Sequence, residues 1–222
     1  EDDKALAAFR TLARDLGVTL HVGSISVLVK PGKLANRSFV IAPTGDVVGR
    51  YDKIHMFDAA LGGGENFRES KNYEPGAEAV VVDLPWGALG LSVCYDLRFP
   101  HLYRALAQAG ARAIAVPSAF ARQTGEVHWH PLLKARAIET EAFILASAQA
   151  GRHECGRETF GRSLIVSPWG EVIAEGGVHP SVTVADVQLR RVAEARRSIP
   201  SLEHDRPFNL VRVGYPARRS AS

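Results

Sequence analysis

The residues best suited to chemistry lie in the segment LGLSVCYDLRFP, from Leu89 to Pro100. Its apolar run predicts a buried strand that ends at Cys94, and Pro100 suits the first position of a helix, where its missing N–H costs nothing. In α/β proteins, catalytic side chains are often exposed where a strand turns into a helix. The start of a helix lowers the pKa of a thiol and can hold an oxyanion. The pattern therefore favours a cysteine nucleophile over the alternative, a small buried thiol.

The other groups that could do chemistry give weaker signals. The chain has eight histidines, so a Cys–His pair is possible, but none lies in a pattern typical of a cysteine protease. The pairs His128 and His130, and His153 and Cys155, lack the spacing of a zinc site, so we predict neither a metal nor another cofactor. The two cysteines lie in different contexts, which predicts no disulfide and favours a reducing, cytoplasmic location, with Cys155 as a surface thiol.

Composition limits the class of protein. The 222 residues are 46% hydrophobic and 23% charged, which predicts one α/β domain with a sizeable core. The net charge is only +3, and no basic stripe with interleaved aromatics occurs, so we expect no nucleic-acid partner. No apolar run approaches the roughly 20 residues of a membrane span, so we expect no membrane partner. The only methionine is Met56, and the first residues already follow a helical pattern, so we expect a single domain over residues 1–222 that is N-terminally incomplete.

The order of elements predicts mixed sheets. Apolar residues spaced as on one face of a helix, followed by a glycine, predict helices. Apolar runs on either side of turns that contain proline and glycine predict strands and hairpins. A segment without period, residues 58–78, is expected to be a long loop of the kind that is often functional. Hairpins mixed with strand–helix–strand units exclude a simple doubly wound sheet and favour mixed sheets with helices outside. The expected helices are 6–16, 100–109, 127–143 (with Pro131 in its first turn) and 190–199; the strands are 18–27, 111–119, 144–150 and 181–189; the hairpins are 37–54, 79–96 and 163–176.

Four segments, in order, resemble motifs of the nitrilase (carbon-nitrogen hydrolase) superfamily. CYDLRFP resembles its nucleophile motif, GRYDKIHMFD its lysine motif, TGEVHWHPLLKARAIE its third segment and GRSLIVSPWGEVIAE the hairpin that follows. The order and spacing match from about residue 10 to residue 208. Within the superfamily, the match is closest to the branch of the deaminated-glutathione amidases and the ω-amidases.

The resemblance implies an αββα sandwich of two mixed β-sheets flanked by helices, and a Glu–Lys–Cys triad. Lys53 would be the lysine, Cys94 the nucleophile, and the backbone N–H of Tyr95 an oxyanion donor. An ammonium beside a thiol stabilises the thiolate and then the charge of the tetrahedral intermediate. The family's first glutamate has no counterpart in this sequence. His130 stands where the family often has a second glutamate, so a supporting role beside the lysine is expected for it.

The resemblance also implies residues that bind substrate. Arg98 matches a position that binds a substrate carboxylate, and a guanidinium suits that bidentate task; the alternative is a structural ion pair with Asp96 or another acid. Phe120 and Thr124 match positions that line the α-keto-acid end of the pocket; the alternative is packing and turn capping.

The implied activity is hydrolysis of a primary amide of a small, carboxylate-bearing substrate to acid and ammonia, through a thioester on Cys94. The substrate would be deaminated glutathione or an ω-amide of an α-keto dicarboxylate. Two alternatives stay open: a nitrilase or N-carbamoyl amidohydrolase, and a non-catalytic assembly module that lacks the general base. Family members usually dimerise, so a homodimer or higher homo-oligomer is expected.

Overall fold

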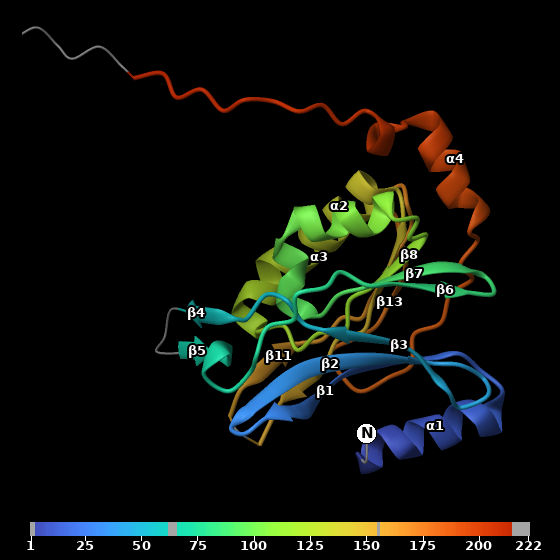
Figure 1. Ribbon diagram of the computed structural model, residues 1–222, viewed down its shortest axis with the longest axis vertical. Coiled ribbons are helices and arrows are strands. Elements are labelled where there is room, and N and C mark those ends of the chain that lie inside the picture. Colours follow the sequence, from blue (N-terminus) through green and yellow to red (C-terminus); the bar gives the residue numbers. More distant parts are fainter. Residues whose placement is uncertain (1–2, 62–65, 155, 215–222) are drawn as a thin grey trace, which may run out of the picture.

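The computed structural model describes residues 3–61, 66–154 and 156–214. Its elements stack in four layers: helix α1, a three-stranded sheet, a six-stranded sheet, and helices α2 and α3 (Figure 1). The smaller sheet is wholly antiparallel and the larger one is mixed. The predicted αββα sandwich is confirmed. In the part of the chain that is described, no helix is both long and apolar enough to cross a membrane.

The smaller sheet is formed by two successive hairpins. Strands β1 (Leu20–Lys30), β2 (Lys33–Ile41) and β3 (Val47–Asp52) pair in sequence order, which confirms the predicted hairpin over residues 37–54. Helix α1 (Lys4–Leu16) covers the outer face of this sheet and ends, as predicted, at Gly17, whose φ of 64° favours glycine.

The larger sheet carries parallel strands at its centre. Its order is β13-β12-β9-β8-β7-β6, with β7, β8 and β9 parallel and the outer pairs antiparallel. Helix α2 (Pro100–Gln108) connects β7 to β8 and confirms the predicted strand–helix–strand unit. Helix α3 (Arg122–Thr140) connects β8 to β9. The strands are β6 (Val81–Leu84), β7 (Gly87–Leu91), β8 (Ala113–Ala115), β9 (Phe143–Ala146), β12 (Leu164–Val166) and β13 (Val172–Glu175).

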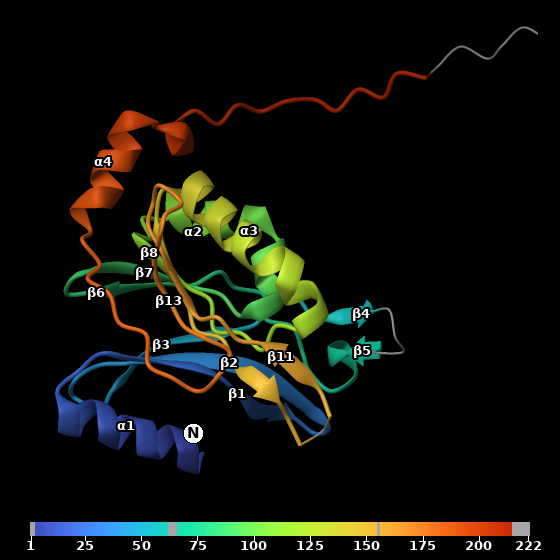
Figure 2. The same ribbon diagram turned by 180° about the vertical axis from the view of Figure 1, so that it is seen from behind.

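Short elements border these layers. Two small hairpins are formed by β4 (Asp58–Ala60) with β5 (Asn66–Arg68), and by β10 (Ala150–Arg152) with β11 (Glu158–Phe160). Three 3-10 helices are η2 (Glu69–Lys71), η3 (Cys94–Arg98) and η4 (Ser201–Glu203). Helix α4 (Arg190–Ser198) lies where it was predicted, and residues 204–214 run away from the layers without regular structure (Figure 2).

Three expectations about the elements are wrong. Helix α3 begins at Arg122, so Pro131 lies inside it; full burial of Trp129 and Leu133 offsets the hydrogen bond that the proline removes. The segment 181–189 forms no strand, because its alternating valines Val182 and Val184 face solvent at 89% and 82% exposure. The segment 58–78 is not wholly a loop, since it contains β4, β5 and η2.

The core between the two sheets should contribute strongly to stability. Leu91 on β7 is 0% exposed in this core, whereas Leu28 on β1 is 70% exposed. We expect Leu91→Ala to lower the free energy of unfolding by about 2–5 kcal/mol, because it removes buried methyl groups and leaves a cavity. Leu28→Ala is the matched control and should change it by less than about 1 kcal/mol. Urea unfolding measures both, and equal effects would contradict this account of the core.

Candidate active site

Cys94 lies just beyond the end of a parallel strand. Strand β7 ends at Leu91, and Cys94 opens the 3-10 helix η3, so the predicted place for the cysteine is confirmed. We call residues 93–98 the Cys94 turn. The φ of Cys94 is +50°, a conformation that is uncommon for residues other than glycine and typical of functional turns. Its backbone N–H donates to the carbonyl of Pro117 at 3.0 Å, which ties the turn to the chain that follows β8.

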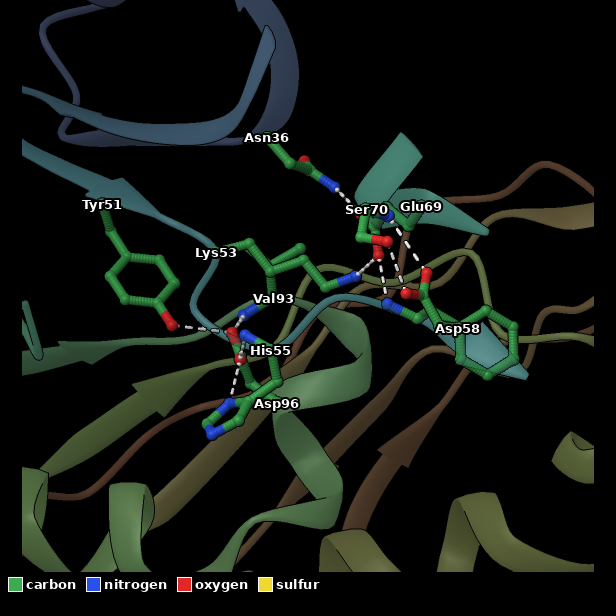
Figure 3. A network of polar contacts seen from close by, with 10 residues as sticks. Asn36, Tyr51, Lys53, His55, Asp58, Glu69, Ser70, Val93 and Asp96 are labelled. Carbon is green, nitrogen blue, oxygen red and sulfur yellow. Dashed lines mark hydrogen bonds and ion pairs between the residues drawn. The ribbon is translucent and has the colours of Figure 1, made fainter. Parts of the chain in front are cut away.

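Asp96 joins the Cys94 turn to the smaller sheet. Its side chain is 0% exposed, and Figure 3 shows it at the centre of a hydrogen-bond network. One oxygen accepts from Val93 N at 2.9 Å and from the Tyr51 hydroxyl at 2.7 Å. The other oxygen lies 3.0 Å from His55 N and 2.7 Å from His55 Nδ1. Arg98 does not form the alternative ion pair with Asp96, because these groups occupy the carboxylate.

Lys53 reaches the same place from the end of β3. It follows the last residue of that strand, and only 2% of it is exposed. Its Nζ donates to the carboxylate of Glu69 (Figure 3). Glu69 also accepts from Phe57 N at 2.6 Å and from Asn36 Nδ2 at 3.0 Å. These donors occupy both oxygens, so Glu69 is suited to holding the lysine rather than to taking a proton.

Glu69 was missed by the sequence reasoning, and His130 was assigned its place. His130 lies on helix α3, where its Nε2 is 3.2 Å from Glu175 Oε1, and it does not contact Lys53. The expected supporting role of His130 is therefore corrected. The only signal for Glu69 was its position in the segment 58–78, which was expected to be functional but gave no reason to choose one residue.

A cavity of about 870 Å³ opens beside Cys94 and Lys53. The described residues that line it include Glu69, Arg68 and Arg157. They do not include the three side chains predicted to bind substrate, namely Arg98, Phe120 and Thr124.

The three predicted substrate-binding side chains make contacts within the fold. The Arg98 guanidinium lies 5.9 Å from the centre of the Tyr95 ring and 5.2 Å from that of Phe120. Phe120 is 4% exposed and packs against Trp129. The Thr124 hydroxyl donates to the carbonyl of Ala121 in the first turn of α3. The contacts of Phe120 and Thr124 correspond to their packing and capping alternatives. Their roles in binding stay predictions.

No group of three or more His, Cys, Asp or Glu side chains suited to a metal ion occurs among residues 3–61, 66–154 and 156–214. The expected surface thiol, Cys155, lies outside the described residues.

Comparison with known proteins identifies the family of the chain. Residues 1–197 match the family "Carbon-nitrogen hydrolase". A deaminated glutathione amidase of Yersinia enterocolitica is 42% identical over 89% of this chain and 70% of its own length. The chain belongs to the carbon-nitrogen hydrolase family. The predicted enzyme class, an amidase of this family, is thereby confirmed.

Two solved structures have a fold similar to that of this chain. The NitFhit protein of C. elegans has a TM-score of 0.86 at 35% identity, over 92% of this chain and 50% of that chain. This carbon-nitrogen hydrolase therefore spans half the length of the C. elegans chain. An amidase from Nesterenkonia sp. AN1 has a TM-score of 0.73 at 29% identity, over 87% of this chain and 70% of that chain. A mutant of that amidase carries the acetamide moiety of fluoroacetamide covalently added at its active-site cysteine.

The electrostatics of Cys94 in this hydrolase differ from the expectation. Burial raises the pKa of the thiol, and the charge of Lys53 lowers it by less. The negative charges of Glu69 and Asp96 raise the pKa further. The physical reason is that Lys53 shares its charge with Glu69, so the thiol receives only part of the lysine's field. The resting site therefore favours a neutral thiol.

The Asp96 network should be necessary for the fold and for the site. We expect Asp96→Asn to lower the free energy of unfolding by roughly 3 kcal/mol, because an amide NH₂ then faces two of the four groups that the carboxylate binds. Asp83→Asn, at an exposed position of β6, is the matched control and should have little effect. Chemical unfolding measures the difference, and a neutral Asp96→Asn would contradict the role given to this carboxylate.

The pH dependence of Cys94 alkylation should follow its neighbours. We expect the rate to rise with a midpoint above the roughly 8.5 of a free thiol, because burial favours the protonated form. Lys53→Met should move the midpoint up, since it removes a positive charge, and Glu69→Gln should move it down, since it removes a negative one. Iodoacetamide labelling, read on the Cys94 peptide by mass spectrometry, separates this thiol from Cys155. A wild-type midpoint below 8 would be inconsistent with a desolvated thiol.

Proposed function

We propose that Cys94 is the nucleophile and Lys53 the charge-stabilising residue of an amidase that acts on deaminated glutathione or an ω-amide of an α-keto dicarboxylate. The observation that carries the proposal is the placement of both side chains on the wall of one cavity, with Lys53 held by Glu69 and Cys94 on a strained turn. The acetamide moiety on the active-site cysteine of the Nesterenkonia sp. AN1 amidase supports the cysteine's role by analogy.

The proposed reaction has two steps. The Cys94 thiol gives up its proton and its sulfur attacks the amide carbonyl; that proton passes to the amine nitrogen, the C–N bond breaks, and the neutral amine leaves, which gives a thioester. Water then attacks the thioester and releases the acid and the thiol. The ammonium of Lys53 and the N–H of Tyr95 would stabilise the oxyanion in both steps. Within the described residues, the amides of Cys94 and Asp96 donate to backbone carbonyls, whereas that of Tyr95 makes no such bond, which supports its role as a free donor.

The choice of substrate rests on the relatives and on the cavity. Several relatives are named deaminated glutathione amidase, at 37–42% identity. In deaminated glutathione the bond to the acyl part is a secondary amide, so the leaving group is the amine of cysteinylglycine rather than ammonia. Ammonia would leave only from a primary amide such as α-ketoglutaramate. A cavity of about 870 Å³ lies within the range that holds ligands of either size.

Several further features stay proposals from the sequence and the resemblance. They are a single domain over residues 1–222, a homodimer or higher homo-oligomer, and a cytoplasmic location. A reducing location suits a mechanism that needs a free thiol at Cys94. A nitrilase or an N-carbamoyl amidohydrolase would use the same two residues, so a nitrile and a carbamoyl compound belong in the substrate panel.

Activity should depend on one of the two cysteines. We expect Cys94→Ala to lower the rate of 2-oxoglutarate formation from deaminated glutathione and from α-ketoglutaramate by roughly 1,000-fold or more, because no thioester can form. Cys155→Ser is the matched control and should keep most of the activity. Quenching with acid and measuring intact mass should reveal an acyl adduct in the wild type that Cys94→Ala lacks. If Cys94→Ala keeps a tenth of the activity, the proposed nucleophile is wrong. A wild type that neither turns over nor acylates would favour the non-catalytic assembly module.

A further inference from the structure

Two small hairpins at the edge of the cavity each contribute an arginine to its lining. Arg68 ends strand β5, and Arg157 directly precedes strand β11. We call the β4–β5 and β10–β11 hairpins together the rim. Figure 1 shows them on the same side of the molecule, and a contact joins them, because the Arg157 guanidinium lies 4.8 Å from the centre of the Phe67 ring on β5.

This contact orients Arg157 without using its hydrogen-bond donors. A guanidinium over an aromatic ring is held by its face, while its in-plane N–H groups stay available for a planar anion. Among the described residues, no carboxylate pairs with Arg157 or Arg68. The neighbouring acid, Glu158, is taken by Arg122 at 2.9 Å instead. The rim thus presents a fixed cation whose donors are free.

The charges of the cavity lining favour an anion at the rim. The charged side chains of the lining are Lys53, Arg68, Glu69, Arg157 and Glu158. Lys53 and Glu69 neutralise each other, and Glu158 shares Arg122 with Glu126. Three cations against two carboxylates leave the lining with a net positive charge. Arg68 lies opposite Asp58 across the β4–β5 pair, so Arg157 is the main cation that the rim offers to an anion.

Aromatic side chains connect the Cys94 turn to the rim. A series of ring contacts leads outward from Tyr95, next to Cys94, to Phe57 at 4.9 Å and from Phe57 to Phe67 at 4.9 Å. Arg157 follows at 4.8 Å from Phe67. A carboxylate on Arg157 therefore belongs to a part of the substrate beyond the scissile amide, such as the C-terminus of a two-residue leaving group, at roughly 3.5 Å per residue.

We propose that Arg157, assisted by Arg68, binds a carboxylate at the far end of the leaving group. The ligand class is an amide whose amine part ends in a carboxylate, as the C-terminus of a short peptide does. The bond would be a bidentate, charge-assisted pair, which fixes direction as well as affinity. This inference rests on the proposed amidase function and adds the part of the substrate that the rim selects.

Two substrates with the same acyl part provide the test. The leaving group of deaminated glutathione is cysteinylglycine, which has a carboxylate. The leaving group of α-ketoglutaramate is ammonia, which has none. We expect Arg157→Gln to lower kcat/KM for deaminated glutathione by roughly 10- to 100-fold and to leave that for α-ketoglutaramate within about twofold. Arg157→Lys should recover part of the loss. Arg152→Gln, on β10 and outside the cavity lining, is the matched control and should change neither.

The outcomes separate this inference from the proposed function. An equal loss on both substrates, or no loss on deaminated glutathione, overturns the role of Arg157 while the amidase stands. If the wild type hydrolyses neither compound, the proposed function fails. Binding at the rim is then tested by the protection of Cys94 from alkylation, which needs no turnover. Cysteinylglycine should then slow alkylation of Cys94 at concentrations where its C-terminal amide does not, and Arg157→Gln should abolish that difference. Equal protection by the two dipeptides overturns the inference.

Discussion

The hydrogen bonds that converge on the buried Asp96 carboxylate determine the geometry of the site. The donors come from two different parts of the fold, the Cys94 turn on one side and Tyr51 and His55 on the other. Tyr51 and His55 flank Lys53 in sequence, and Asp96 lies two residues after Cys94. One group therefore fixes the lysine relative to the thiol. Because all four bonds share this buried carboxylate, they should form and break together.

A second set of contacts supports the turn from the opposite side. Arg136 on helix α3 is 5% exposed and donates to the carbonyl of Leu97 at 2.9 Å, while its guanidinium also binds Glu139 at 2.7 Å. The Cys94 turn is thus held between the smaller sheet and a helix packed on the larger one. Such attachment on both sides explains how a cysteine can keep a φ of +50°. The β10–β11 hairpin of the rim is attached to the chain before α3, where Phe160 N donates to the carbonyl of Phe120 at 2.9 Å.

Features that follow from a local pattern of residues could be predicted from the sequence. Side-chain partners that are distant in the sequence could not. The end of a strand at Cys94 could be predicted from an apolar run and a proline, and Lys53 came from the family resemblance. Glu69 could not be chosen, because it lies in a segment without period and its partner is 16 residues away. His130 was misassigned because its place in a motif does not reveal which way a helix faces. The strand expected around Val182 failed for a similar reason, since alternation predicts a strand only where a sheet is there to receive it.

The burial of Cys94 has a consequence for oxidative damage. Peroxide oxidises thiolates far faster than thiols, and reactive redox sensors are exposed cysteines of low pKa. Cys94 differs: it is half-buried on the cavity wall, its pKa is raised, and the neighbouring lysine is already paired with a carboxylate. The resting protein therefore carries its sulfur in the form that oxidants attack slowly. The burial that raises the pKa of the Cys94 thiol therefore also protects it from oxidation while no substrate is bound.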